Sequence, residues 1–190
     1  MKKLITLLSL LFTVQIVFSQ NPGNQSTEPI KEIIFKFFEW DNIKDNLKPG
    51  SQKYSLTKET ITGNMKKISI DKKGVELYLN RYRTSGLFSE SYLNNLRQYF
   101  YEIGKTLDSS PKIERSAIIK VDGIGLDIPL QSLEPELILE HYKEGVLKEF
   151  AIISNKCIAQ FFIPKYETKL IFTLSKINNN WAIDYIGYYQ

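Results

Sequence analysis

The 190-residue chain is predicted to adopt an α+β fold, in which N-terminal helices pack on a curved C-terminal antiparallel sheet. Two observations support this prediction. Apolar residues recur at steps of three and four through much of the first half, which is the period of a buried helical face. After Gly145 the period changes to two, and polar turns separate segments rich in β-branched and aromatic residues, as in consecutive hairpins.

The first helix is expected to span residues 28–46. Thr27 stands where an N-cap belongs, and Pro29 is tolerated in the first turn because its missing N–H has no acceptor there. Lys48-Pro49-Gly50 ends the helix. Its buried stripe is formed by apolar residues at three-and-four spacing, namely Ile30, Ile33, Ile34, Phe37 and Phe38.

Two further helices are expected after a polar segment. Residues 51–73 are weakly periodic and are predicted to be mostly loop, with a short element at 65–70. A short amphipathic helix follows and ends at Thr84-Ser85-Gly86, because Val75, Tyr78, Leu79 and Tyr82 share one face. Ser89 is the expected N-cap of a third helix that continues to Leu107, with Phe88 packing on Leu93 as a hydrophobic staple.

The second half of the chain is predicted to end in an antiparallel meander. Residues 108–145 carry many turn residues, with a strand expected at 117–121 and a helical turn at 137–142. Four strands are then expected at residues 147–154, 157–163, 169–176 and 181–189. Alternation places two sets of residues on the face that helices cover: Leu170, Phe172 and Leu174 on one strand, and Trp181, Ile183 and Tyr185 on the next.

The N-terminus has the form of a cleaved secretory signal. Lys2 and Lys3 precede an apolar run over residues 4–18, and a cut after Ser19 fits the export peptidase. The run is shorter than the roughly 20 residues of a membrane-spanning helix. We therefore predict a signal peptide at 1–19, a flexible tether at 20–27 and one domain at 28–190. The protein is expected to be exported, to the periplasm or the medium, without stable membrane insertion after cleavage.

The net charge and the cysteine content of the chain limit the kinds of function that we expect. Loss of Lys2 and Lys3 lowers the 25 basic residues to 23, against 21 acidic ones, so the net charge falls from +4 to +2. A nearly neutral domain with interleaved charges is not expected to bind nucleic acid. The single cysteine, Cys157, lies in an apolar run and is interpreted as a buried small hydrophobe, with a reactive thiol or an intermolecular bridge as alternatives.

The candidate site residues are His141, Asp122, Asp127, Asp184 and Tyr185. His141 has no partner at metal-ligand spacing and is interpreted as a surface or capping residue, with acid–base catalysis as the alternative. Asp184 alternates with apolar neighbours, so it faces either water, which we favour, or a polar pocket. The glycine-rich segment from Asp122 to Asp127 matches neither a calcium loop nor a phosphate loop and is interpreted as a turn. No cofactor and no metal are expected.

A resemblance to a known superfamily rests on three features. They are the order of elements, the link Ser85-Gly86-Leu87-Phe88-Ser89-Glu90 into a helix rich in Leu and aromatic residues, and the last strand Trp181-Ala182-Ile183-Asp184-Tyr185-Ile186. In these the chain resembles secreted bacterial domains of unknown function in the nuclear transport factor 2-like (NTF2-like) superfamily, a cystatin-like α+β group. The resemblance implies a cone, with a bent sheet around helices and a cavity at its open end.

Members of that superfamily either use the cavity for isomerase, dehydratase or cyclase chemistry or only bind and dimerise, so the fold does not settle the function. Enzymatic members carry a carboxylate base or a His/Asp pair with tyrosine donors, and no such motif can be placed on this sequence residue by residue. We therefore expect a noncatalytic binding domain for a small apolar ligand or a protein. The alternative is a small cofactor-independent enzyme that uses a cavity carboxylate.

Two further features bear on the binding hypothesis. The 11 tyrosines and 11 phenylalanines would suit a cavity for an apolar ligand, although core packing is the favoured interpretation. A homodimer through the exposed sheet face is compatible with either function, and Tyr185, Tyr188 and Tyr189 are the expected contact residues.

Overall fold

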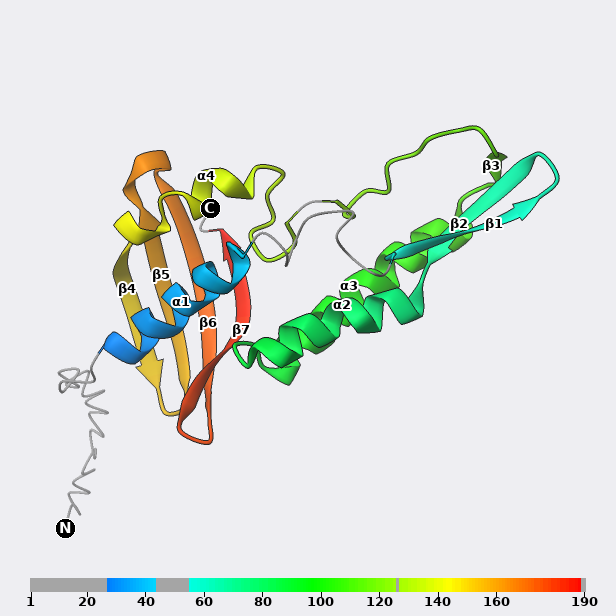
Figure 1. The fold of residues 1–190 in the computed structure, drawn as a ribbon. Coiled ribbons are helices and arrows are strands. Elements are labelled where there is room, and N and C mark those ends of the chain that lie inside the picture. Colours follow the sequence, from blue (N-terminus) through cyan, green and yellow to red (C-terminus); the bar gives the residue numbers. More distant parts are fainter. Residues whose placement is uncertain (1–26, 44–54, 126, 189–190) are drawn as a thin grey trace, which may run out of the picture.

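The computed structural model describes residues 27–43, 55–125 and 127–188, and within them the fold is α+β (Figure 1). The predicted signal peptide, most of the tether, the stop signal at 48–50 and Tyr189 lie outside the described residues. The elements are α1 (Glu28–Asp41), β1 (Thr57–Thr62), β2 (Met65–Ile70), α2 (Lys72–Ser85), α3 (Glu90–Ser109), β3 (Ile113–Glu114), α4 (Pro135–Leu139), η1 (Tyr142–Glu144), β4 (Val146–Ile153), β5 (Lys156–Ile163), η2 (Pro164–Tyr166), β6 (Thr168–Ile177) and β7 (Asn180–Tyr188).

The predicted meander is confirmed as a four-stranded antiparallel sheet in the order β4-β5-β6-β7. Helix α1 lies across one face of this sheet (Figure 1), and its apolar stripe is buried as predicted. Phe37 packs edge-on against Phe172 of β6, with ring centroids 5.8 Å apart. The main core of the molecule is therefore the layer between α1 and the inner face of the sheet.

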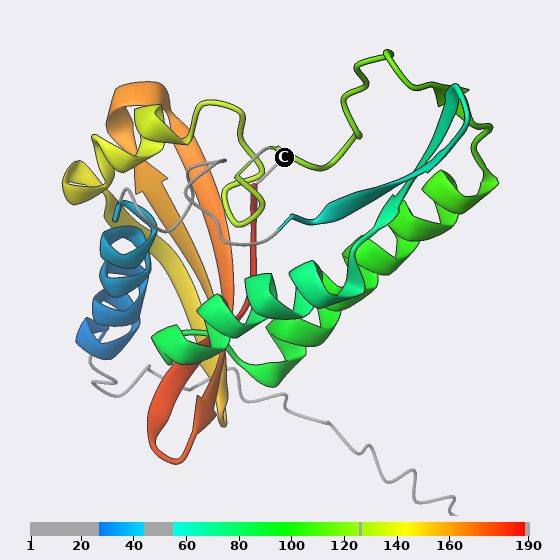
Figure 2. The same ribbon diagram turned by 45° about the vertical axis from the view of Figure 1, so that its right-hand side comes forward.

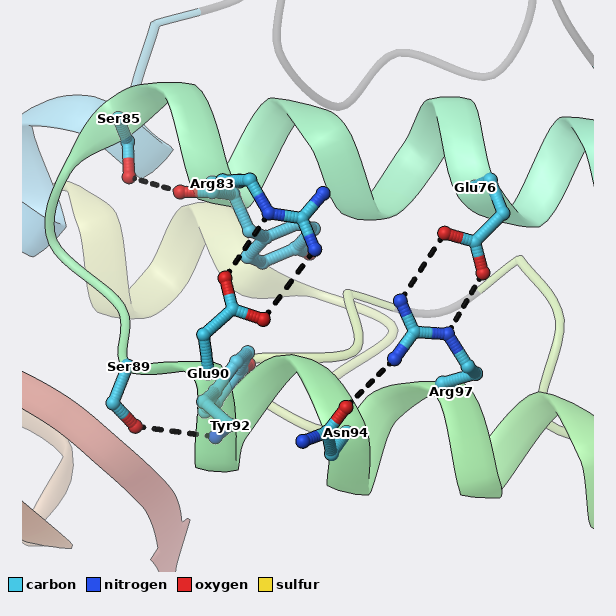
Figure 3. A network of polar contacts seen from close by, with 9 residues as sticks. Glu76, Arg83, Ser85, Ser89, Glu90, Tyr92, Asn94 and Arg97 are labelled. Carbon is cyan, nitrogen blue, oxygen red and sulfur yellow. Dashed lines mark hydrogen bonds and ion pairs between the residues drawn. The ribbon is translucent and has the colours of Figure 1, made fainter.

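Helices α2 and α3 form a pair whose ends follow local capping rules. Gly86 ends α2 in the left-handed region, at φ 70°, which glycine adopts without a steric penalty. Ser89 Oγ accepts from Tyr92 N at 3.2 Å, which confirms the predicted N-cap of α3. Two bidentate ion pairs, Arg83 with Glu90 and Arg97 with Glu76, join the helices on their exposed side (Figure 3).

A second sheet has the order β1-β2-β3 and lies at the far end of α2 and α3 from the meander (Figures 1 and 2). The expected element at 65–70 is confirmed as β2, but the loop predicted before it is wrong, because Thr57–Thr62 pairs with β2 as β1. Almost every side chain of β1 is exposed, so its sequence carries no alternation of apolar and polar residues.

Other differences from the sequence prediction are local. Helix α1 ends at Asp41 rather than at residue 46, and the Thr27 hydroxyl makes no capping hydrogen bond. No strand forms at residues 117–121, where Ile118 is 98% exposed; apolar side chains there have no sheet to pack on. At the start of α3, Phe88 packs on Tyr92, with ring centroids 4.6 Å apart, and it shares the buried core with Leu93, its predicted staple partner.

A β-bulge in β7 changes which residues face the helices. Thr173 pairs with Tyr185 and Leu174 with Ile183, so Asp184 is the extra residue and the alternation shifts after it. Ile183 is buried as predicted, whereas Tyr185 is 48% exposed on the opposite face. The predicted inward orientation of Tyr185 is therefore wrong.

Candidate functional site

Five buried polar residues from four segments of the chain interact where α1, α2 and α3 meet. We call them the acid–tyrosine cluster: Asp41, Tyr78, Tyr82, Tyr92 and Asp127. Asp41 is the last residue of α1, the tyrosines belong to α2 and to the first turn of α3, and Asp127 precedes α4. The two carboxyl groups belong to residues only 2% and 8% exposed, respectively.

The burial of Asp41 follows from its position on α1. It lies four residues after Phe37 and three after Phe38, so it continues the apolar stripe of the helix on the core-facing side. A carboxylate at such a position is costly unless hydrogen bonds or an opposite charge compensate it. The sequence thus places an acid where the packing of α1 calls for an apolar residue.

The hydrogen bonds of the cluster are incomplete among the described residues. Neither carboxyl oxygen of Asp41 has a hydrogen-bond partner there. Asp127 Oδ1 accepts from Leu130 N at 2.8 Å, which shapes the turn before α4, but Asp127 Oδ2 has no partner. The hydroxyl oxygens of Tyr78 and Tyr82 lie 2.5 Å apart in a mutual hydrogen bond. Buried acceptors without donors each cost about 1–3 kcal/mol.

Burial also changes the proton affinity of both acids. Desolvation raises the pKa of Asp41 well above its ordinary value, the nearby Asp127 charge raises it further, and Arg81 on α2 opposes both effects. Desolvation raises the pKa of Asp127 to about 6, although the Leu130 N–H lowers it. The Asp127 carboxyl can therefore exchange between an acceptor and a donor form near neutral pH, and burial favours the protonated donor form of Asp41.

The tyrosines of the cluster are correspondingly weak acids. Burial, and then the charges of nearby groups that include Asp41, raise the pKa values of Tyr78, Tyr82 and Tyr92. They therefore stay neutral and act as hydroxyl donors or acceptors with apolar rings. Tyr188 at the end of β7 also feels the Asp127 charge, after burial, through a raised pKa. The cluster thus combines two buried carboxyl groups with the aromatic rings of neutral tyrosines.

Asp184 belongs to a separate polar cluster that fastens α3 to the sheet. Its carboxylate accepts from Ser89 Oγ at 2.5 Å, from Lys156 Nζ at 3.0 Å and from Ser175 Oγ. Burial would raise the pKa of Asp184, but these hydrogen bonds hold it below the ordinary value. The favoured interpretation of a water-facing Asp184 is wrong, because the β7 bulge turns it toward the N-terminus of α3.

The hydrogen bonds of this second cluster hold the structure together and do not activate Ser175 as a nucleophile. Lys156 donates to Ser175, and Ser175 donates to Asp184. Ser175 is only 6% exposed, and its hydroxyl donates to a carboxylate that Ser89 and Lys156 also engage, so the hydroxyl is not presented to a substrate. The three residues with Ser89 therefore act as an anchor for the α3 terminus.

The remaining candidates lie outside both clusters. His141 is the residue before η1 and is partly exposed, but its side chain makes no capping hydrogen bond; its Nδ1 lies 2.9 Å from Glu144 Oε1. Asp122 is exposed. Cys157 is buried, as predicted, and burial raises the pKa of its thiol to about 11. Within the described ranges, no group of three or more His, Cys, Asp or Glu residues is arranged to hold a metal ion.

The sequence prediction contained part of the acid–tyrosine cluster. Asp127 was assigned to a plain turn, which is correct for its backbone but not for its buried carboxyl. Asp41 was missed, although its place on the stripe of α1 was a sufficient signal. Tyr78 and Tyr82 were assigned to a buried helical face, where they lie.

Comparison of the chain with protein-family models, with curated proteins and with solved structures gave no match. The part of the chain that the structure describes contains no helix with the length and apolarity needed to cross a membrane.

Proposed function

We propose that this protein is an exported, noncatalytic binding domain that holds a small ligand at the acid–tyrosine cluster. The observation that carries the proposal is the carboxyl group of Asp41, which is almost fully buried and lacks a hydrogen-bond partner among the described residues. Buried acceptors are nearly always paired in folded proteins, so two oxygens without a partner among the described residues are acceptors that a ligand can engage. The secretory pattern at residues 1–19 supports export to the periplasm or the medium.

The chemistry of the cluster favours a ligand with an apolar body and a protonated amine. An ammonium group offers up to three N–H donors, which matches the two oxygens of Asp41 and Oδ2 of Asp127, all three of which lack a partner among the described residues. Its charge would also favour ionised carboxyl groups, which burial disfavours. The rings of Tyr78, Tyr82 and Tyr92 offer apolar and cation-binding surface.

The overall architecture we propose is the NTF2-like cone. The support is the order of elements, with helices first and the meander last, and the position of α1 across the sheet. Burial and then the charge of Asp127 raise the pKa of Tyr188 at the end of β7, so the acid–tyrosine cluster lies near that end of the sheet. In a cone of this type the interior is the natural place for a ligand.

The binding proposal is tested with amines and their uncharged isosteres. Isothermal titration of the chain from Gln20 with 2-phenylethylamine, and with 2-phenylethanol as the neutral control, should show binding of the amine alone. Asp41→Asn removes the charge and keeps the shape, and we expect it to weaken amine binding by about tenfold or more. Asp122→Asn is the matched control, because Asp122 is exposed in the same loop as Asp127. Equal affinity for both compounds, or an unaffected Asp41→Asn variant, would contradict the proposal.

A second candidate is a small cofactor-independent enzyme of the isomerase, dehydratase or cyclase type. The observation that favours it is Asp127, whose pKa of about 6 suits a group that takes and returns a proton near neutral pH. The Tyr78–Tyr82 hydroxyl pair could then stabilise developing negative charge. If the protein acts this way, C–H positions of a bound ligand should exchange with D₂O, as followed by NMR, and Asp127→Asn should abolish the exchange. Binding without exchange favours the noncatalytic function.

A further inference from the structure

The end of α2 and α3 that points away from the meander carries several exposed apolar side chains. The sheet β1-β2-β3 lies at this end (Figures 1 and 2). We call this sheet and the segments around β3, residues 57–70 and 108–121, the arm tip. Its exposed large apolar residues are Ile61, Met65, Ile118 and Ile119, and Ile118 is 98% exposed. The arm tip therefore presents apolar surface to the solvent from more than one segment.

The backbone gathers these side chains at the turn between β1 and β2. Ile61 and Met65 lie on either side of this turn. Glu114 of β3 pairs with Met65. Ala117 N donates to Glu114 O at 3.0 Å, in a turn that leads directly to Ile118. Single exposed apolar residues scattered over a surface need no explanation, but a group of them in one place marks an interaction site.

The arm tip also carries the positive charge of the predicted mature chain. It contains six basic and three acidic residues, so its net charge is +3, whereas the net charge of the chain after Ser19 is +2. Two of the cations bind within the protein, since Lys66 pairs with Glu59 and Lys67 donates to backbone carbonyls. The other four are exposed, and none forms an ion pair among the described residues: Lys58, Lys112, Arg115 and Lys120. They outnumber the two remaining acids, Asp108 and Glu114.

The sheet of the arm tip is fixed to the end of α3. Lys67 Nζ donates to Asp108 O at 3.1 Å and to Ser110 O, so β2 is fastened to carbonyl groups at the C-terminus of the helix. Gly104 of α3 lies so close to β2 that an added Cβ would be 3.4 Å from Ile70 Cγ1. A surface on an ordered support loses little conformational entropy when a partner covers it.

A projecting basic tip with few apolar side chains fits a lipid surface better than a protein surface. Stable protein interfaces bury about 800 Å² and about 20–30 residues on each side, whereas the arm tip offers four large exposed apolar residues. A bilayer takes up single apolar side chains in its headgroup layer, and each Lys or Arg close to an anionic surface adds attraction. The net positive charge of the arm tip therefore selects an anionic bilayer.

We propose that the arm tip binds to the surface of an anionic lipid bilayer, with Ile118 and the β1–β2 turn in the headgroup layer and the four exposed cations against the lipid phosphates. The attachment is peripheral, so no element crosses the bilayer. The acid–tyrosine cluster lies where α1, α2 and α3 meet, away from the arm tip, so membrane binding does not depend on the proposed ligand.

Co-sedimentation of the chain from Gln20 with lipid vesicles tests the proposal. Vesicles of equimolar phosphatidylglycerol and phosphatidylcholine should bind the protein at least about tenfold more tightly than pure phosphatidylcholine vesicles, and binding should weaken as salt rises toward about 1 M. Arg115→Glu combined with Lys120→Glu should weaken binding by about tenfold or more, because the change reverses two charges. Ile118→Ser should weaken it by about fivefold, because an apolar side chain is lost from the headgroup layer.

Matched controls change the same properties at the other sheet. Lys165→Glu combined with Lys176→Glu alters the net charge equally, at exposed positions of the meander. Ile153→Ser removes an isoleucine that is 76% exposed on β4. Both controls should bind anionic vesicles as the wild type does. All of the substituted side chains are exposed, so circular dichroism should be unchanged.

A label at Ile118 shows whether the arm tip itself enters the bilayer. Ile118→Cys can be labelled with an environment-sensitive dye, since Cys157 is buried. The emission should shift to the blue with anionic vesicles and stay constant with neutral ones. The absence of binding to anionic vesicles would overturn the proposal and leave the apolar group to a protein partner. Equal binding to neutral vesicles, equal losses in the control variants or an unshifted emission would overturn it as well.

Discussion

Replacement of Asp127 by asparagine should stabilise the protein at alkaline pH and leave it nearly unchanged at acid pH. Burial raises the pKa of Asp127 from an ordinary 3.8 to about 6, so the folded state binds this proton more tightly than the unfolded state. A carboxyl with a raised pKa contributes stability that is complete below its unfolded pKa and is lost as the pH rises through the folded pKa. The amide of asparagine keeps an oxygen that can accept from Leu130 N but cannot ionise.

The size of the effect follows from the same pKa values. Each tenfold change in proton affinity corresponds to 1.36 kcal/mol, so the interval from 3.8 to about 6 corresponds to about 3 kcal/mol. Above about pH 7, Asp127→Asn should therefore exceed the wild type in free energy of unfolding by up to about 3 kcal/mol, and the two should converge near about pH 4. Loss of the Asp127 charge should also lower the pKa of Asp41, because that charge raises it.

Urea unfolding followed by tryptophan fluorescence, at several values between about pH 4 and about pH 8, measures this difference. The comparison with Asp122→Asn, at an exposed acid of the same loop, removes effects of net charge. A constant difference between the Asp127→Asn variant and the wild type across this range would refute the reasoning, because it would show that Asp127 titrates alike in the folded and unfolded states. Destabilisation at alkaline pH would refute it more strongly.

Two further predictions concern the anchor of α3 and the buried thiol. Ser89→Ala removes the N-cap bond from Tyr92 N and the donor to Asp184, and should lower the free energy of unfolding by about 1–2 kcal/mol at neutral pH in urea titrations. Hydrogen bonds hold the pKa of Asp184 low in the folded protein, so the stability that its carboxylate contributes is lost as the pH falls through the folded pKa. The loss of unfolding free energy caused by Ser89→Ala should therefore become smaller in acid. A loss that does not change with pH would contradict this prediction. Cys157, buried and with its pKa raised to about 11, should react with a thiol reagent such as DTNB slowly in the native protein and quickly in denaturant, and an equally fast native reaction would show the thiol to be accessible.

The sequence predicted those elements whose side chains alternate between core and solvent. The stripes of α1, α2 and α3 and the period of two in the meander both depend on one buried face, and each was found. Strand β1 was missed because its side chains are almost all exposed, and its pairing with β2 is made by the backbone. At residues 117–121 the error was the opposite one: a strand was predicted from apolar residues with high β-propensity, but no strand forms there because no partner strand is available.

The candidate site was harder to predict because it depends on contacts between distant segments. The bulge at Asp184 depends on how β6 pairs with β7, which the sequence of β7 alone does not show. A prediction from simple alternation therefore placed Tyr185 on the inner face and Asp184 in solvent, and both placements were wrong. The acid–tyrosine cluster joins α1, α2, α3 and the segment before α4. Of these residues, only Asp41 could be recognised from its local sequence, because it is an acid on the apolar stripe of α1.

The most direct test of the ligand-site proposal is a crystal structure of the chain from Gln20, purified without added ligand, with attention to the electron density around Asp41. The proposal predicts density for a group outside the chain whose donor atoms lie about 3 Å from the Asp41 carboxyl oxygens. Hydrogen bonds to both Asp41 oxygens from the protein's own side chains, with no further density between Asp41 and Asp127, would contradict it.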